Sequence, residues 1–394
     1  MISEKMKNLG SNRSVIRELF EYGKKRAAEI GSENVYDFSL GNPSVPAPES
    51  VEREIKRLLS ENDATVLHGY TSAQGDAWVR KTISENLKKR FNASVSPDLI
   101  YMTCGAAASL TITLKALSEE GDEFVTFAPF FPEYRVFTEG VGAKFVPVKS
   151  IDKTFQVDKD AFEKAINEHT KGVIINTPNN PSGVILNKES VRAIVEVLEK
   201  KEKEYGHEIF ILSDEPYREL VYSDTENPVF LNEYDNTILC YSYSKSLSLP
   251  GERIGYIAVS DRIKNKADVY AAVCGAGRVL GYVCAPSLMQ RVVAVCDGET
   301  ADVSVYKKNR DLLYNSLTEF GYECVYPDGA FYLFVKTPTK NAKDFSDKAC
   351  EYDLLIVPAD SFGVEGYVRI AYCVSTEMIE KALPKFKALI EEYK

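Results

Sequence analysis

Polar side chains follow three apolar runs of the sequence, at the points where three predicted strands end. The runs are 172–176, 209–213 and 237–241. The residues that follow these runs could take part in binding or acid–base chemistry. Asn180 follows the first run, Asp214 and Tyr217 follow the second, and Ser242, Ser244 and Lys245 follow the third. Parallel α/β sheets collect their ligands at the carboxyl ends of strands. We therefore expect these side chains to meet at one edge of a sheet.

Lys245 is the candidate for covalent chemistry. It lies between two serines just past a buried strand, where partial desolvation would lower the pKa of its amine and free the lone pair. Such an amine can form a Schiff base with an aldehyde. A lysine in a serine-rich loop is also an ordinary surface residue. Its position alone leaves both interpretations open.

Arg253 and the two serines indicate a phosphate site. Hydroxyl donors together with a guanidinium fork, as in Ser242, Ser244 and Arg253, suit a phosphate group. At a neighbouring strand end, Asp214 could pair with a cationic ring nitrogen. Pyridoxal 5′-phosphate has an aldehyde, a phosphate and such a nitrogen. Together with Lys245, these residues predict a site for this cofactor.

The segments around these residues resemble those of a known family. Residues 242–255 read Ser-Tyr-Ser-Lys-Ser-Leu-Ser-Leu-Pro-Gly-Glu-Arg-Ile-Gly. This segment resembles the cofactor-lysine signature of class I/II aminotransferases, which are fold type I pyridoxal-phosphate enzymes of the aspartate aminotransferase superfamily. Residues 176–183 and 214–217 resemble two further motifs of the family, in its order and spacing. The resemblance runs from about Asp37 to Arg369 and so covers most of the chain.

The resemblance implies a role for each polar residue at the centre of the site. Lys245 would bind the cofactor covalently and then move a proton between the substrate Cα and cofactor C4′. Asp214 would pair with the ring nitrogen, with Tyr134 supporting it from behind. Tyr217 and Asn180 would donate hydrogen bonds to the phenolic oxygen of the cofactor. Lys245, Asp214 and Tyr217 are thus the expected catalytic residues.

A run of small residues, Gly105, Ala106 and Ala107, follows the predicted strand 99–103 and opens a helix. Backbone N–H groups at a helix N-terminus bind phosphate, and small residues permit its close approach. Members of the family often have hydroxyl residues here, whereas the two alanines have none. The serine pair and Arg253 are therefore expected to carry a larger share of the phosphate binding.

The resemblance also implies contacts to the cofactor ring and to the substrate. Phe131 matches the aromatic residue that stacks on the ring, with the neighbouring Phe130 as the alternative. Arg369 matches the arginine that binds the substrate carboxylate as a bidentate clamp. A solvated position at a strand edge is the alternative interpretation of this arginine. Gly41 would contribute backbone contacts to the same carboxylate.

Tyr70 matches a tyrosine that reaches the phosphate in the partner subunit, so the resemblance implies a homodimer with isologous contacts. In dicarboxylate-specific relatives a second arginine, from the neighbouring subunit, binds the distal carboxylate. Arg278 lies near the sequence position at which such an arginine could occur. The alternative is that Arg278 has a structural role. Arg13 and Arg17 could close over the site on an N-terminal helix, or could be solvated. Aspartate, glutamate, aromatic and branched-chain amino acids all stay open as donors.

The expected activity is pyridoxal-phosphate-dependent transfer of an amino group from an L-amino acid to a 2-oxo acid (EC 2.6.1.-). Aspartate, glutamate or an aromatic amino acid is the favoured donor. The same first steps can end in β-elimination, as in a carbon–sulfur lyase, or in ring closure, as in aminocyclopropane-carboxylate synthases. The fold also serves as the effector domain of pyridoxal-phosphate-sensing regulators. Such regulators usually carry an N-terminal DNA-binding domain, and only a short segment precedes the resemblance here.

The elements that must position these residues alternate between strands and helices. This alternation predicts an α/β domain whose mostly parallel sheet is sandwiched by helices, as in fold type I. The predicted strands are 99–103, 123–128, 144–148, 172–176, 209–213, 237–241 and 255–259. Strands at 331–335, 354–357 and 368–371 with long helices on either side predict a smaller α+β domain. We expect a large cofactor-binding domain at 45–290 and a discontinuous small domain at 1–44 and 291–394.

Composition excludes several other classes of protein. The 394 residues include 48 Lys and Arg against 58 Asp and Glu, and this net charge of −10 disfavours nucleic acid and anionic membranes as partners. No apolar run approaches the roughly 20 residues that a membrane helix needs. Eight cysteines without a C-x-x-C pair and three scattered histidines predict no metal site. We expect a reduced, cytoplasmic enzyme that acts on small molecules.

Overall fold

Seven strands form the main sheet of the computed structural model, which describes residues 2–11 and 15–394. The strand order is β2-β8-β7-β6-β5-β3-β4. Neighbouring strands are parallel except at β8, which is antiparallel to β2 and β7. The strands are β2 (Ile100–Thr103), β3 (Glu123–Ala128), β4 (Lys144–Lys149), β5 (Thr170–Asn176), β6 (Phe210–Asp214), β7 (Thr237–Ser242) and β8 (Gly255–Val259). The predicted mostly parallel sheet is confirmed.

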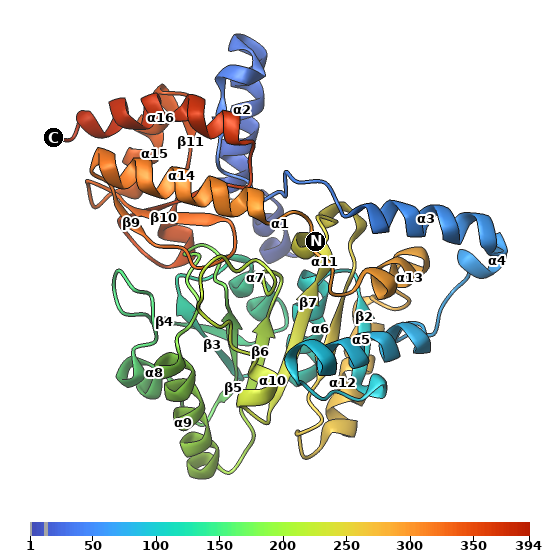
Figure 1. Cartoon of the computed structure of the whole chain (residues 1–394). Helices are drawn as coiled ribbons and strands as arrows, with labels where there is room; N and C mark the ends of the chain where they lie inside the picture. The colour runs from blue at the N-terminus through green and yellow to red at the C-terminus, as the bar shows by residue number, and fades with distance from the viewer. Residues whose placement is uncertain (1, 12–14) are drawn as a thin grey trace.

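Helices cover both faces of this sheet (Figure 1). On β5, Ile174 packs into a core with α6 (Ala106–Leu117) and α12 (Lys266–Leu280). Its neighbours on either side in the strand, Val173 and Ile175, point the other way, into a core with α8 (Lys159–Ala165) and α9 (Lys188–Tyr205). Because successive side chains of a strand point to opposite faces, a strand buried on both faces is apolar throughout. This explains the uninterrupted apolar runs of the sequence.

A second, antiparallel sheet has the order β12-β13-β10-β9. Its strands are β9 (Glu323–Val325), β10 (Tyr332–Lys336), β12 (Val357–Pro358) and β13 (Tyr367–Ala371). The helices around it are α14 (Ser304–Phe320), α15 (Ala342–Glu351) and α16 (Thr376–Glu391). Near the N-terminus, β1 (Tyr36–Asp37) pairs in parallel with β11 (Leu354–Leu355). The predicted small α+β unit is therefore present, and the N-terminal segment joins it.

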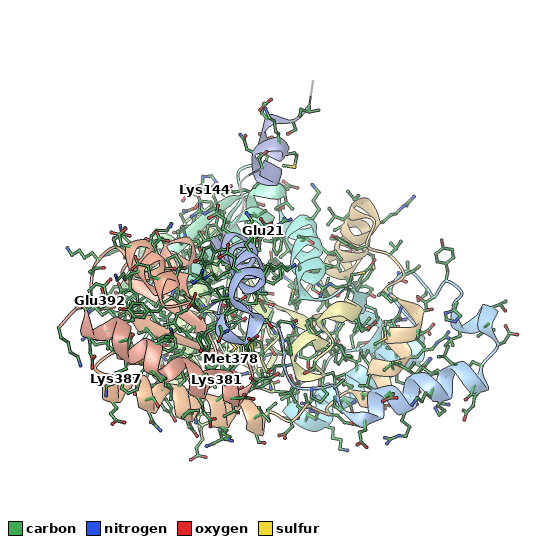
Figure 2. All side chains as sticks on the ribbon, turned by 90° about the horizontal axis from the view of Figure 1, so that it is seen from above. Glu21, Lys144, Met378, Lys381, Lys387 and Glu392 are labelled. Carbon is green, nitrogen blue, oxygen red and sulfur yellow. The ribbon has the colours of Figure 1, made fainter. Side chains whose placement is uncertain are left out.

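The remaining helices connect or flank the two sheets. They are α1 (Glu4–Ser11), α2 (Val15–Ile30), α3 (Glu49–Glu61), α4 (Ala64–Leu67), α5 (Ala77–Phe91), α7 (Glu133–Gly140), α10 (Phe230–Glu233), α11 (Tyr243–Ser246) and α13 (Ser287–Cys296). Seen from above, α2, which carries Glu21, lies beside the C-terminal segments (Figure 2), and it packs against β11 and β12. Within the described residues, no helix is long and apolar enough to cross a membrane. The domain boundaries at 44/45 and 290/291 stay a prediction.

Candidate active site

A cavity of about 310 Å³ lies where β5, β6 and β7 end. Most of the predicted site residues line it, although they come from segments far apart in the sequence. Those lining it are Gly41, Ala106, Ala107, Phe131, Asn180, Asp214, Tyr217, Ser242, Ser244, Lys245, Arg253 and Arg369. The structure thus brings together the residues that the sequence motifs singled out, at the edge of the sheet where they were expected.

Lys245 reaches into the cavity from the short helix α11, which begins directly after β7. Its Nζ donates a hydrogen bond of 2.5 Å to the carbonyl oxygen of Gly41. Burial lowers the pKa of the Lys245 amine to about 8, and the guanidinium groups of Arg369 and Arg253 act in the same direction. The amine can therefore lose its proton near neutral pH, as a nucleophile or a general base must.

Asp214 ends β6 and is buried. The Tyr134 hydroxyl donates to its Oδ2 at 2.5 Å, as predicted for a residue that supports Asp214 from behind. The other carboxylate oxygen, Oδ1, is also buried and has no hydrogen-bond partner. Burial raises the pKa of this carboxyl to about 7. A buried carboxylate oxygen without a partner is costly, so this position fits a ligand that offers a cationic N–H group.

The N-terminus of α6 is a candidate anion site. Gly105, at φ +86°, precedes this helix, and Ala106 and Ala107 open it. Arg253 is held above this turn, with Nη2 donating to the Cys104 carbonyl at 3.4 Å. A Cβ atom at Gly105 would lie only 3.0 Å from Nη2, so glycine lets the guanidinium approach. Helix N–H groups beside a guanidinium suit a phosphate.

Ser242 and Ser244 complete this end of the cavity. The Ser242 hydroxyl caps α11 by accepting a hydrogen bond from the Ser244 N–H at 3.2 Å, and the two hydroxyls are 2.8 Å apart. An amine, an unpartnered carboxylate oxygen and an anion cradle therefore share one cavity. This set of groups fits pyridoxal phosphate, with its aldehyde, ring nitrogen and phosphate.

Arg369, on β13, also lines the cavity, in the part that we call its carboxylate end. Its guanidinium is buried between the rings of Tyr332 and Phe362, at 4.7 and 5.1 Å from their centroids. Nη1 donates to Asn180 Oδ1 at 3.1 Å, and Nη2 donates to the Ser39 carbonyl at 2.6 Å. Nε has no hydrogen-bond partner. The guanidinium is thus fixed while it keeps donors for a carboxylate.

Tyr217 presents a neutral hydroxyl to the same cavity. Burial raises its pKa well above the ordinary value, so the phenol keeps its proton at neutral pH. Its hydroxyl lies 2.9 Å from the hydroxyl of Tyr332, which also lines the cavity. Sequence reasoning missed Tyr332 because it begins an apolar strand and reads as a core residue. Only the pairing of β10 with β13 would have placed it beside Arg369.

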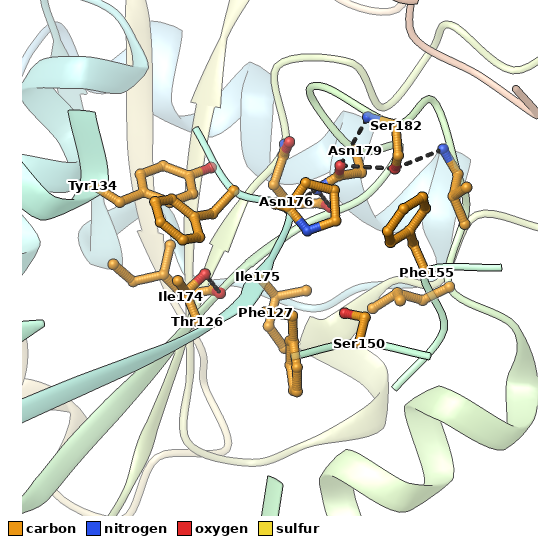
Figure 3. A pocket seen from close by; sticks show the side chains of 14 residues that line it. Thr126, Phe127, Tyr134, Ser150, Phe155, Ile174, Ile175, Asn176, Asn179 and Ser182 are labelled. Carbon is orange, nitrogen blue, oxygen red and sulfur yellow. Dashed lines mark hydrogen bonds between the residues drawn. The ribbon is translucent and has the colours of Figure 1, made fainter. Parts of the chain in front are cut away.

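Asn176 lies in the motif at residues 176–183, but the sequence indicated no role for it. Its side chain donates to the Asp214 carbonyl at 2.9 Å and accepts from the Asn180 N–H at 2.8 Å. Behind it, Asn179 Oδ1 accepts from both the N–H and the hydroxyl of Ser182. Figure 3 shows this folded loop around a small cavity of about 30 Å³, which Tyr134 also lines. Asn176 therefore joins the strand end at Asp214 to the loop that carries Asn180.

The structure distinguishes the two adjacent phenylalanines. Phe131 lines the site cavity. Phe130 is buried and packs edge-on against Phe145, with ring centroids 5.0 Å apart. Phe131 is thus the one that can contact a ring bound in the cavity. Three other apolar residues, which the sequence gave no reason to select, also line the cavity, and they are Ile16, Leu110 and Phe137.

Three of the remaining candidates are described by the structure, and none of them lines the cavity of this chain. Tyr70 is 98% exposed. Arg278 is exposed on the last turn of α12. Arg17 forms an ion pair of 3.5 Å with Glu21 on α2 and does not line the cavity. The remaining candidate, Arg13, lies outside the described residues.

Comparisons with known proteins agree with this geometry. Residues 32–386 match the family described as aminotransferase class I and II. A probable aspartate aminotransferase of Methanocaldococcus jannaschii is 30% identical, over 99% of this chain and 100% of that protein. Aromatic-amino-acid aminotransferase 2 of Thermococcus litoralis is 28% identical, over 97% of each chain. The crystal structure of an aminotransferase from Eubacterium rectale has a TM-score of 0.98 and 55% identity, over 100% of this chain and 99% of that chain.

Proposed function

This chain belongs to the class I and II aminotransferase family, and on that premise we propose that it is a pyridoxal-phosphate-dependent aminotransferase. It transfers the amino group of an L-amino acid to a 2-oxo acid. One observation carries the proposal: Lys245 and the unpartnered Oδ1 of Asp214 line the same cavity. Burial brings the pKa of each group near neutrality, to about 8 and about 7.

The cofactor would occupy the sheet end of the cavity. When bound, pyridoxal phosphate supplies an aldehyde that condenses with amines and a ring that takes up the electrons of the substrate Cα. Asp214 would hold the ring nitrogen, and Phe131 would lie against the ring. Tyr217 and Asn180 would donate to the phenolic oxygen. The phosphate would bind to the cradle formed by Gly105, Ala106, Ala107, Ser242, Ser244 and Arg253.

Lys245 moves the proton in this proposal. Its Nζ removes the proton from the substrate Cα and holds it until the proton is returned, which needs an amine that titrates near neutral pH. Arg369 binds the substrate carboxylate through the donors left free by Asn180 and Ser39. The Gly41 carbonyl accepts a hydrogen bond from Nζ and so holds the amine in place within the cavity.

The proposed donors are aspartate, glutamate or an aromatic amino acid. The relatives named above include a probable aspartate aminotransferase and an aromatic-amino-acid aminotransferase, which supports both classes. To test this, the cofactor-loaded protein is incubated with aspartate or an aromatic amino acid and 2-oxoglutarate, or with glutamate and oxaloacetate, and both products are measured. We expect equal amounts of the donor's 2-oxo acid and of the amino acid formed from the acceptor. Ammonia and pyruvate without glutamate would instead indicate β-elimination.

We also propose that the active unit is a homodimer. Tyr70, which matches a tyrosine that reaches the phosphate of a partner subunit in the family, is exposed and does not line the cavity of its own chain, which supports this proposal. Mixing subunits tests this. Lys245→Ala and Tyr70→Ala chains, each impaired alone, should form hybrids with one complete site and regain part of the activity. Additive residual activities would contradict shared sites. A cytoplasmic location stays a prediction of the sequence.

A further inference from the structure

Tyr332 contacts both functional ends of the cavity. It begins β10, opposite Ala371 of β13, so its ring lies diagonally across the sheet from Arg369. The Arg369 guanidinium packs on this ring at 4.7 Å from its centroid. At the far end of the same side chain, the hydroxyl lies 2.9 Å from that of Tyr217. One side chain therefore connects the arginine clamp with the hydroxyl expected at the cofactor.

Glycine at position 41 makes this arrangement possible. A Cβ atom there would lie 2.0 Å from the Tyr332 hydroxyl oxygen, so a side chain at Gly41 would displace the tyrosine. The carbonyl of the same glycine accepts the hydrogen bond from Lys245. The Tyr332 hydroxyl is therefore confined between Gly41 and Tyr217, close to the reacting amine.

The two hydroxyls must share their protons in one of two ways. Each hydroxyl has a single proton to donate. If Tyr217 donates to Tyr332, no proton remains for the cofactor oxygen. If Tyr332 donates to Tyr217, the Tyr217 proton is free. Burial raises the pKa of Tyr332 to about 12, and the Arg369 guanidinium, 4.7 Å from the ring centroid, opposes this rise. A cation packed on the phenol ring makes its O–H a stronger donor, so Tyr332 is the better donor of the two.

We propose that Tyr332 is a positioning residue with two tasks. Its hydroxyl donates to Tyr217 Oη and so directs the Tyr217 proton toward the phenolic oxygen of the bound cofactor. Its ring holds the Arg369 guanidinium at the angle at which a substrate carboxylate is bound. This inference rests on the proposed function, and it adds a residue that makes the cofactor contact and the substrate contact depend on each other.

The pH titration of the visible absorption band of the loaded protein tests the hydroxyl. Tyr332→Phe keeps the ring and should raise the pKa of this band by about half to one pH unit, the worth of one hydrogen bond. The reason is that Tyr217, once it accepts no bond itself, is a weaker donor to the ionised oxygen. In a Tyr217→Phe background, adding Tyr332→Phe should shift the band no further.

Tyr322→Phe is the matched control, because it also removes a buried hydroxyl, one that donates to the Phe386 carbonyl away from the site. It should leave the band unchanged. A band pKa unaffected by Tyr332→Phe, or shifted equally with and without Tyr217, would overturn the role of the hydroxyl. A wild-type protein that shows no band at all would overturn the proposed function instead, so the two failures are distinguishable.

The KM for the amino donor tests the ring. Tyr332→Leu should raise KM by about tenfold through loss of the ring under the guanidinium, whereas Tyr332→Phe should leave KM within about twofold. Equal KM values for the two variants would overturn this part. The Phe variant keeps the packing of the core, so it answers the question about the hydroxyl even if the Leu variant does not fold.

Discussion

The cofactor end and the carboxylate end of the cavity are built in different ways. At the cofactor end, Ser242, Ser244, Lys245 and Arg253 all come from the segment 242–253, folded over the end of one sheet. At the carboxylate end, Arg369 is fixed by a carbonyl, an amide and two rings from four separate segments. The first end is built by the large sheet and the segments that follow its strands, whereas the second exists only when the N-terminal segment and the small sheet meet the large one.

Cofactor retention and substrate binding should therefore be separable. Removing a group from the segment 242–253 should affect the cofactor, whereas removing a group held by the small sheet should affect substrates first. Gly41 and Tyr332 are where the two ends meet, through Lys245 on one side and Tyr217 on the other. Each prediction below tests whether the two ends are as separable as this account requires.

The largest effect is expected from Lys245→Ala. It should lower kcat/KM by more than about 10⁴-fold, since one amine is both the nucleophile and the proton carrier. The variant should still bind pyridoxal phosphate non-covalently through the phosphate cradle, as equilibrium dialysis can measure. Lys188→Ala, at an exposed surface ion pair, is the control. Substantial turnover by the Lys245 variant would remove the proposed centre.

Arg369→Ala comes next. Truncating a buried, hydrogen-bonded charge should weaken transition-state binding by about 2–5 kcal/mol. The loss should appear as a lower kcat/KM for monocarboxylic and dicarboxylic donors alike. Cofactor binding should stay close to that of the wild type if the two ends are separable. Steady-state kinetics with an aromatic donor and with aspartate check this. A loss confined to dicarboxylic donors would mean that another arginine binds the α-carboxylate.

Asp214→Asn should stabilise the cofactor-free protein at alkaline pH. Burial raises the pKa of Asp214 from 3.8 to about 7, so the folded state favours the protonated acid. The wild type therefore loses stability as pH rises from 3.8 to about 7 and loses no more above that, whereas asparagine cannot ionise. We expect a gain of about 1–3 kcal/mol above pH 8. Urea unfolding at two pH values measures it, and a gain already complete below pH 6 would contradict the assignment.

The smallest expected effect is a shift on the pH axis. The cofactor-free protein should capture pyridoxal phosphate faster as pH rises, because only the neutral amine attacks an aldehyde. The midpoint should lie near the lowered Lys245 pKa of about 8 rather than the ordinary 10.5. Stopped-flow absorbance follows the capture. A midpoint near the ordinary value would mean that Lys245 is solvated before the cofactor binds.

The cofactor end could be predicted from the sequence because its residues follow strand ends within short motifs. Apolar runs located β5, β6 and β7 to within two residues, and the residues after them line the cavity as expected. The Tyr134 contact to Asp214 was also predicted. Here local sequence and tertiary position agree, since the end of a parallel strand is where ligands gather.

The carboxylate end was only partly predictable. Arg369 could be named from its resemblance, but the groups that fix it depend on strand pairings that the sequence does not reveal. Tyr332 and Ile16 were not among the expected site residues, although both line the cavity. Periodicity shows that a residue is buried, but it does not distinguish burial in a core from burial at a site.

An absorbance spectrum of the purified protein loaded with pyridoxal phosphate tests the central claim most directly. It is recorded before and after adding an amino donor, and again after adding a 2-oxo acid. We expect a visible band that shifts with pH, that one donor abolishes and that a 2-oxo acid restores. Lys245→Ala, which can hold only the free aldehyde, should lack the pH-dependent shift. No visible band in the wild type, even with excess cofactor, would contradict the assignment of Lys245 and Asp214 to a cofactor site.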